Sequence, residues 1–261
     1  MNRYAILWDY ICYYFSAKTK HDIHSPFVFE FVTKVLNKKF IDGSAERIEK
    51  LRKELLSSSL EINVCDFGAG IENTTKDKHR LKDIIKNSAK SKKYAGLLYR
   101  IIKYYNLQNV LELGTSAGIS SMYMAAAIPI GKVITVEGNP EIAKLAAENF
   151  SNAGFNNIIQ VTGDFDDVLS GILEKEKSFD CIFIDGNHRE EATLRYFELC
   201  LPHIHNETVF IFDDIRWSEG MKNAWEKIKL HPSVKVSIDL FFLGIVFFRK
   251  ELSKEDFVVR F

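Results

Sequence analysis

The sequence predicts an α/β protein in which a mainly parallel sheet is covered by crossover helices. From residue 107 onward, short β-branched or aromatic runs alternate with stretches of helical hydrophobic periodicity. Several of these helical stretches open with Pro or acidic residues, as helix N-termini do. Residues 1–60 lack the alternation and are predicted to be helices interrupted at Ser25-Pro26 and near Asp42-Gly43. The sheet should therefore follow a helical N-terminal extension.

Seven strands are expected from the apolar runs. They are Asn109–Leu113, Lys132–Glu137, Asn157–Thr162, Phe179–Asp185, Thr208–Asp213, Val234–Leu240 and Gly244–Arg249. Only a few residues around Leu243 and Gly244 join the last two runs, too few for a parallel crossover. The chain should therefore end this series in an antiparallel hairpin.

Five helices are expected between the strands. They are Gly118–Ala127, Pro140–Ala153, Asp167–Glu176, Glu190–Leu201 and Glu219–Leu230. The polar stretch 72–93 is predicted to hold a loop and a short helix, and Tyr94–Tyr105 a helix that leads into the first strand. We expect two parts, an N-terminal helical extension and loop over 1–89 and a ligand-binding domain over 90–261.

Composition and charge exclude several classes of partner. The 261 residues carry 35 basic and 35 acidic side chains, a net charge of zero that gives no argument for a nucleic-acid partner. The apolar N-terminus is too short and too rich in Tyr and charge for a spanning helix, so no membrane partner is expected. The four cysteines form no C-x-x-C pair and indicate reduced thiols, hence a cytoplasmic location.

The strongest local signal is the segment VLELGTSAGISS over Val110–Ser121. An apolar strand ends there in a Gly/Ser-rich turn that runs directly into a helix. Glycine at 114 and 118 lets the backbone approach a ligand, and the helix N-terminus offers free N–H groups. A nucleotide-like ligand fits such a turn.

Three interpretations compete for this turn. A nicotinamide fingerprint would need glycines where the chain has Ser116 and Ile119, so that match is poor. The pattern G-x-S-x-G over Gly114–Gly118 matches the nucleophile elbow of a serine hydrolase that uses Ser116. The pattern E-x-G-x-(G/S)-x-G, starting at Glu112, resembles the S-adenosylmethionine loop of class I methyltransferases.

Acidic residues further along the chain favour the third interpretation. Glu137 ends the second strand 23 residues after Gly114, where a carboxylate can accept both ribose hydroxyls. The hydrolase interpretation gives Glu137 no role and needs strands before the turn. After the third strand, Asp164 could accept the adenine amino group while Phe165 packs on the ring; Asp164 could equally cap a helix.

Three more carboxylates follow the fourth and fifth strands. Asp185 ends the run FDCIFIDGNH, and Asp213 and Asp214 end VFIFDDI. In an open α/β sheet the carboxyl ends of the strands are where ligands bind. These three side chains are therefore expected on the ligand-binding edge.

Taken together, roughly residues 90–261 resemble class I S-adenosylmethionine-dependent methyltransferases, within the O-methyltransferase-like group. The motifs that carry the resemblance are ELGTSAG (112–118), VEGNP (136–140), GDFDD (163–167), FIDGNH (183–188) and FDDIRW (212–217). The resemblance implies a Rossmann-like seven-stranded, mostly parallel sheet with an antiparallel last strand. The cofactor contacts that it implies are Glu112, Gly114, Thr115, Ser116, Gly118, Glu137, Gly138, Asp164, Phe165 and Asp185.

The resemblance also implies a mechanism, in which an acceptor is aligned with the sulfonium methyl group and loses a proton. In catechol-type relatives a divalent metal assists, and the positions carried over are Asp185, Asp213 and Asp214, with Mg²⁺ or Ca²⁺ as the ion. Two positions depart from that pattern: Asp214 replaces an amide, and His188 replaces a catalytic lysine. His188 suits a general base near neutral pH. Alternatively, Asp213 or Asp214 caps the next helix and His188 is a surface residue.

The sequence thus predicts an enzyme that transfers a methyl group from S-adenosylmethionine, with His188 and Asp185 as catalytic residues. The expected acceptor is an oxygen of a small molecule. Two alternatives stay open, a non-catalytic S-adenosylmethionine sensor or scaffold and the serine hydrolase. The aromatic N-terminal segment is compatible with a homodimer.

Overall fold

The computed structural model describes residues 3–38, 43–64 and 77–261. The chain forms two compact units, which we call the terminal unit (residues 1–37 and 173–261) and the central unit (residues 38–172). Cys65, one of the four cysteines, and Asp66–Gly70, a glycine-containing segment that resembles the turn at 114–118, lie outside the described residues. The division expected at residue 89 stays a prediction.

The central unit holds three parallel strands of the sheet, with β4 paired to both β3 and β5. The strands are β3 (Asn109–Leu113), β4 (Lys132–Glu137) and β5 (Ile158–Thr162). The helices are α3 (Gly43–Ser57), α4 (Leu81–Ser88), α5 (Lys92–Tyr105), α6 (Ile119–Ala127) and α7 (Pro140–Asn152), with α8 (Phe165–Lys175) starting in this unit. Strands β3 and β4 are buried almost throughout because their β-branched and leucine side chains fill the core.

The terminal unit holds five strands and the two ends of the chain. The strands are β6 (Cys181–Ile184), β7 (Val209–Phe212), β8 (Val236–Asp239), β9 (Gly244–Phe247) and β10 (Glu255–Val258). The helices are α1 (Arg3–Ser16), α2 (Pro26–Phe31), the π-helix η1 (Val32–Leu36), α9 (Glu190–Cys200), the 3₁₀ turn η2 (Leu201–His203) and α10 (Glu219–Leu230). Strands β6 and β7 are parallel, and β9 is antiparallel to both β7 and β8.

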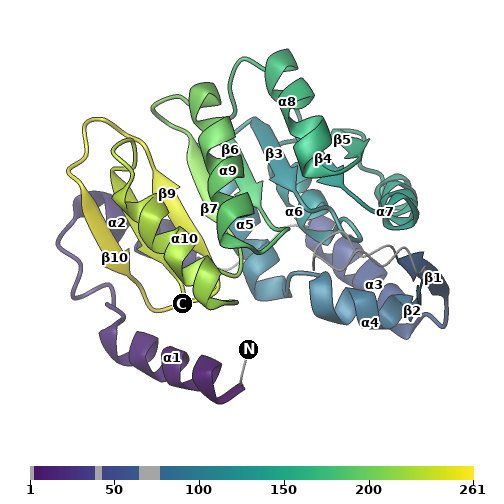
Figure 1. The fold of residues 1–261 in the computed structure, drawn as a ribbon, viewed down its shortest axis with the longest axis horizontal. Helices are drawn as coiled ribbons and strands as arrows, with labels where there is room; N and C mark the ends of the chain where they lie inside the picture. The colour runs from purple at the N-terminus through teal and green to yellow at the C-terminus, as the bar shows by residue number, and fades with distance from the viewer. Residues whose placement is uncertain (1–2, 39–42, 65–76) are drawn as a thin grey trace. The chain divides into compact units, whose positions relative to one another are not determined.

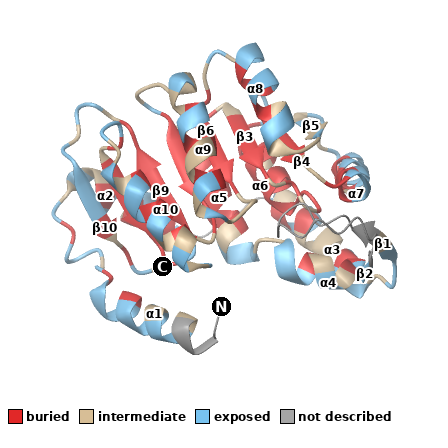
Figure 2. Ribbon diagram, viewed as in Figure 1, coloured by how far each residue is buried: buried red, intermediate tan, exposed pale blue. Residues whose placement is uncertain are grey.

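Aromatic side chains cover the strands of the terminal unit. Phe197 of α9 packs edge-on against Phe210 and Phe212 of β7, at ring-centroid distances of 5.5 and 5.9 Å. Phe27 and Phe31 of the α2 segment pack against Phe247 of β9. Helices α9 and α10 lie side by side in front of these strands in Figure 1, and α2 lies behind them. Figure 2 shows the buried residues gathered in the strands between these helices.

The predicted fold class is confirmed. All seven expected strands are present as β3 to β9, and β9 is the antiparallel one. The series does not end there, because β10 adds a strand parallel to β8, and a separate antiparallel hairpin is formed by β1 (Glu61–Val64) and β2 (Asp77–Arg80). These strands have four residues each and carry charged side chains, so they show no apolar run. Across the described residues, no helix is both long and apolar enough to cross a bilayer.

Candidate functional site

The turn after β3 adopts the backbone that its sequence predicts. Gly114, Ser116 and Gly118 have positive φ angles of 110°, 48° and 80°. The N–H groups of Gly114 and Thr115 both donate to the Val136 carbonyl, at 3.0 and 3.1 Å. A Cβ on Gly118 would lie 2.2 Å from Cε1 of Phe150, so α7 leaves no room for a side chain there. The turn is thus held tightly against β4 and α7 and opens into the N-terminus of α6.

Glu137 holds this turn from the end of β4. Its Oε2 accepts the Ser116 N–H at 2.8 Å, and its Oε1 accepts the Asn139 N–H at 2.9 Å. Burial raises the pKa of Glu137 above its usual value, and hydrogen bonds from the backbone of Asn139, Ser116 and Gly138 oppose this. A carboxylate has about four lone-pair sites, so three backbone donors leave capacity for one further donor, such as a ligand hydroxyl.

Glu112 lies behind the turn and is fully buried. Its Oε2 accepts hydrogen bonds from the hydroxyls of Ser121 and, at 2.6 Å, Thr135. Thr135 is also bonded at 2.6 Å to Thr115, which joins the network to the turn. Burial raises the pKa of Glu112 to about 7, and hydrogen bonds from serine and threonine hydroxyls offset the rise in part. Of the predicted cofactor contacts, Glu112 and Thr115 therefore have side chains committed to the protein interior.

The side chain of Ser116 makes a contact that bears on the hydrolase alternative. Its Oγ lies 2.6 Å from Oγ of Ser88, the last residue of α4. A nucleophilic serine needs a general base within hydrogen-bond reach, and another serine hydroxyl cannot supply one. This arrangement does not support the hydrolase alternative.

Asp164 and Phe165 lie at the start of α8. Oδ1 of Asp164 accepts the Asp166 N–H at 2.9 Å, which is the helix-capping role that the sequence left open. Phe165 is the first residue of α8 and is partly exposed. The helix begins two residues before the predicted Asp167, because this cap lies earlier in the chain. Capping uses one oxygen of Asp164 and is compatible with a ligand contact through the other.

The terminal unit gathers a second group of chemical side chains. One ligand atom each from Asp185, His188 and Asp213 lie within 4.8 Å of one another. Asp185 follows β6, His188 lies in the loop before α9, and Asp213 follows β7. Because β6 and β7 are parallel neighbours, their carboxyl ends bring the two aspartates together. Asp213 is buried, whereas Asp185 and His188 are partly exposed.

Asp214 lies beside this group. Its Oδ2 is 3.9 Å from Nε2 of His188, and its φ angle is 52°. The cap of α10 is Ser218, whose Oγ accepts the Met221 N–H at 3.1 Å. The alternative in which Asp213 or Asp214 caps this helix is therefore wrong.

Sequence reasoning missed several residues that shape both groups. Thr135 and Ser88 support the glycine turn, yet both lie outside its motif. Asn187, with a φ angle of 51°, donates from Nδ2 to the Tyr196 hydroxyl at 3.0 Å and so shapes the loop that carries His188. The Asp-Gly-Asn run was a usable signal, since asparagine tolerates this conformation well.

Comparisons with known proteins agree with the geometry. Residues 111–215 match a family model described as a methyltransferase domain. A catechol O-methyltransferase from Niastella koreensis is 36% identical over 111 residues, which are 41% of this chain and 49% of the relative. One from Mycobacterium tuberculosis is 30% identical over 130 residues, 49% of this chain and 56% of that protein. The chain thus spans about half the length of these curated relatives.

Solved structures share the fold over a longer range. An O-methyltransferase from Bacillus cereus, in complex with SAH, has a TM-score of 0.57 at 22% identity, over 85% of this chain and 97% of that one. The named relatives confirm the sequence resemblance to O-methyltransferases, and the solved structure confirms the fold. They do not favour the sensor or the hydrolase.

Proposed function

We propose that this protein is an S-adenosylmethionine-dependent methyltransferase that methylates a hydroxyl group of a small molecule. The observation that carries the proposal is the grouping of Asp185, His188 and Asp213 at the carboxyl ends of two parallel strands. It occurs in a chain that matches a methyltransferase domain and catechol O-methyltransferases. Such a group suits the deprotonation of an acceptor oxygen.

Cofactor recognition is assigned to the carboxyl ends of β3, β4 and β5. The turn from Gly114 to Gly118 presents backbone and the start of α6, and Glu137 accepts a ribose hydroxyl. Asp164 and Phe165 form the adenine side. Glu112 acts from behind the turn through Thr135 and Thr115, and so supports the shape of the site.

The residues Asp185, His188 and Asp213 fit a divalent cation. Two carboxylates and an imidazole within 4.8 Å of one another form a donor set for Mn²⁺ or a similar ion, and oxygen donors alone would favour Mg²⁺ or Ca²⁺. Asp214, expected as a ligand, is not part of this group, and its Oδ2 lies 3.9 Å from Nε2 of His188. A bound ion there would stabilise the acceptor as an alkoxide or phenolate.

Proton removal is assigned to His188. An imidazole accepts a proton near neutral pH, and the Asp214 carboxylate 3.9 Å away would stabilise the resulting imidazolium. His188 cannot ligate a metal and accept the proton through the same nitrogen. The base role therefore requires Asp185 and Asp213 to hold the ion while His188 faces the acceptor.

The experiment that tests the function has two parts. Calorimetric titration with S-adenosylhomocysteine tests the cofactor half, and transfer of a methyl group to catechol, with Mg²⁺, Mn²⁺ or EDTA, tests the acceptor half. Failure to bind S-adenosylhomocysteine would refute the proposal outright. Binding without transfer to any of a panel of hydroxylated aromatic acceptors would refute the catalytic part. A small-molecule acceptor, a homodimer and a cytoplasmic location all stay predictions.

A further inference from the structure

Helix α1 packs on the terminal unit through a narrow seam. Tyr13 and Ala17 are buried against Phe241, with Ile6 and Val258 packed beside them. The Tyr13 hydroxyl donates to the Val259 carbonyl at 2.5 Å. At about 3.6 residues per turn, positions 6, 13 and 17 fall on one side of the helix and its direct extension. This seam accounts for the docking of α1.

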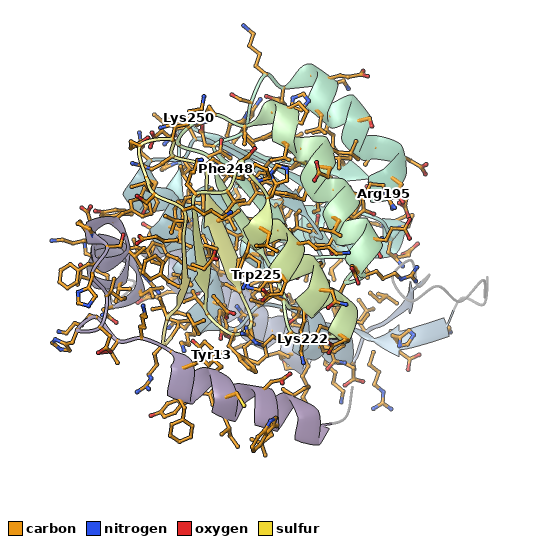
Figure 3. All side chains as sticks on the ribbon, turned by 60° about the vertical axis from the view of Figure 1, so that its left-hand side comes forward. Tyr13, Arg195, Lys222, Trp225, Phe248 and Lys250 are labelled. Carbon is orange, nitrogen blue, oxygen red and sulfur yellow. The ribbon has the colours of Figure 1, made fainter. Side chains whose placement is uncertain are left out.

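The opposite side of α1 is apolar and exposed. Trp8 is 66% exposed, Phe15 82% and Leu7 57%, and Tyr10, Ile11 and Tyr14 are also exposed. In Figure 3, aromatic side chains project from α1 on the side away from the labelled Tyr13. Tyr10 also packs edge-on against Phe241, at a ring-centroid distance of 5.0 Å, and so lies at the border with the seam. The other five large side chains are not accounted for by the seam, and such exposed patches mark interaction surfaces. We call this set the outer face of α1.

The order of side chains around the helix is specific. Leu7, Ile11 and Phe15 follow one another at four-residue intervals and form the middle of the outer face. Tyr14 and Tyr10 flank them on one side, and Trp8 flanks them on the other. Purely apolar side chains in the middle with Tyr and Trp at the edges match the depth profile of a bilayer interface, where amphipathic rings lie at the headgroup level.

Charge around the outer face favours a negatively charged surface. Lys18 and Lys20 follow α1, and Arg260 stacks on the Tyr14 ring at 4.1 Å and donates to the Tyr14 carbonyl. Of the acidic side chains nearby, Asp9 pairs with Lys222, labelled in Figure 3, at 2.5 Å. Asp22 accepts two hydrogen bonds from Thr19, which lower its pKa, so it keeps its negative charge. Around the end of α1 the three cations Lys18, Lys20 and Arg260 therefore outnumber the single Asp22 carboxylate, and the Lys18 ammonium lies over the Phe257 ring at 5.5 Å.

We propose that α1 is a peripheral membrane-binding helix that lies on an anionic lipid surface with its outer face in the interface. The apolar residues supply the insertion, and Lys18, Lys20 and Arg260 supply the attraction to lipid headgroups. The N-terminal segment is too short and too rich in Tyr and charge to span a bilayer, but a helix that lies in the interface does not need to span it. The inference is independent of the proposed methyl transfer.

Flotation of the full chain with lipid vesicles tests the proposal. We expect the protein to float with vesicles of phosphatidylcholine and phosphatidylglycerol, and to bind vesicles of phosphatidylcholine alone more weakly. The double variant Trp8→Ser/Phe15→Ser should lower the partition coefficient by at least about tenfold, since two large side chains lose their insertion. The matched control is Ile130→Ser/Leu230→Ser, which removes side chains that are 95% and 74% exposed elsewhere on the surface.

A charge variant separates the electrostatic attraction to lipid headgroups from the insertion of apolar side chains. Lys18→Glu/Lys20→Glu should reduce binding to the anionic vesicles by roughly tenfold or more and leave binding to phosphatidylcholine nearly unchanged. Lys144→Glu, an exposed change on α7, is its control. Thermal unfolding of every variant by circular dichroism shows whether it is folded.

Two outcomes would overturn the proposal. In one, folded wild-type protein fails to float with anionic vesicles. In the other, light scattering shows a dimer that Trp8→Ser/Phe15→Ser converts to monomer while vesicle binding is absent. The outer face would then be covered by a second copy of the chain.

Discussion

The carboxylates of the central unit and those of the terminal unit are held in different ways. Glu112 and Glu137 accept hydrogen bonds from hydroxyls and backbone N–H groups on neighbouring elements. Asp185 and Asp213 instead converge with His188 on a small volume, with Asp214 close by. The first pair is used to fix the shape of a turn. The second group concentrates negative charge next to an imidazole.

Under the proposed function, this difference assigns cofactor recognition to the turn of the central unit and chemistry to the cluster of the terminal unit. A cofactor with fixed shape can be recognised by a rigid turn, whose geometry depends on backbone and on internal hydrogen bonds. Deprotonation of the acceptor needs a base or a bound ion close to the proton that leaves. A cluster of titratable side chains can provide either one. Changes in the central unit should therefore affect cofactor binding and stability, and changes in the terminal group should affect turnover.

The largest effect is expected for Asp213→Ala. Loss of a buried carboxylate from the cluster should lower methyl transfer to an acceptor by about a thousandfold while S-adenosylhomocysteine binds normally. Steady-state transfer assays and calorimetry measure the two quantities. Glu226→Ala, an exposed change on α10, is the matched control. Full activity in Asp213→Ala would show that the cluster has no catalytic role.

Glu137→Ala should have the opposite effect to Asp213→Ala, because it should weaken the binding of S-adenosylhomocysteine. Removing the acceptor of the Ser116 and Asn139 N–H groups leaves these part-buried donors without their partner and removes the proposed ribose contact. We expect S-adenosylhomocysteine to bind about a hundredfold more weakly in calorimetry. Glu141→Ala, in the exposed first turn of α7, should bind normally. Equal affinities in the two variants would contradict the assigned cofactor site.

Gly118→Ala tests the tightness of the turn. The new Cβ would lie 2.2 Å from the Phe150 ring at a φ angle of 80°, so the free energy of unfolding should fall by about 3 kcal/mol. Gly171→Ala in α8 is the control, because nothing lies within 4 Å of its Cβ position. There the helix should gain up to about 1 kcal/mol. Urea denaturation measures both, and an unchanged midpoint for Gly118→Ala would show that the turn can relax.

The smallest effect is a pH dependence from Glu112. Burial raises its pKa from the usual 4.5 to about 7, so the folded state holds the proton more tightly than the unfolded state. Stability should therefore fall as pH rises from about 4.5 to about 7, with a slope of at most about 1.4 kcal/mol per pH unit. Glu112→Gln should remove most of this slope in urea denaturation, and the exposed Glu148→Gln should not. Identical slopes in wild type and Glu112→Gln would exclude the assignment.

The sequence was sufficient for the fold because periodicity reports burial directly. Apolar runs such as Val133–Val136 can only be central strands, and Pro140 after Asn139 marks a helix start that the structure retains with Asn139 as the cap. Strands β1, β2 and β10 were missed because their stability comes from pairing and not from apolar side chains. Such strands leave no periodic signal.

The candidate site was predictable only at the level of positions along strands. Because Asp185 and Asp213 follow the parallel neighbours β6 and β7, the sequence predicted that they lie near each other. The structure adds that a ligand atom of His188 lies within 4.8 Å of both. The hydrogen bonds that Glu112 accepts from the hydroxyls of Ser121 and Thr135 could not be predicted, because these residues lie on other elements. Motif spacing identifies an acidic residue but not the direction of its side chain.

The pairing of the chain's two ends has a consequence for synthesis. Lys18 forms a β-bridge with Val259, and the Tyr13 hydroxyl donates to the Val259 carbonyl, so α1 docks on a surface that includes a residue synthesised 246 positions after Tyr13. A ribosome releases the N-terminal helix more than two hundred residues before that surface exists. During this interval the whole hydrophobic surface of α1 is exposed to chaperones, to lipid and to other nascent chains. A circular permutant that joins the two ends directly would shorten that interval and should fold with less aggregation.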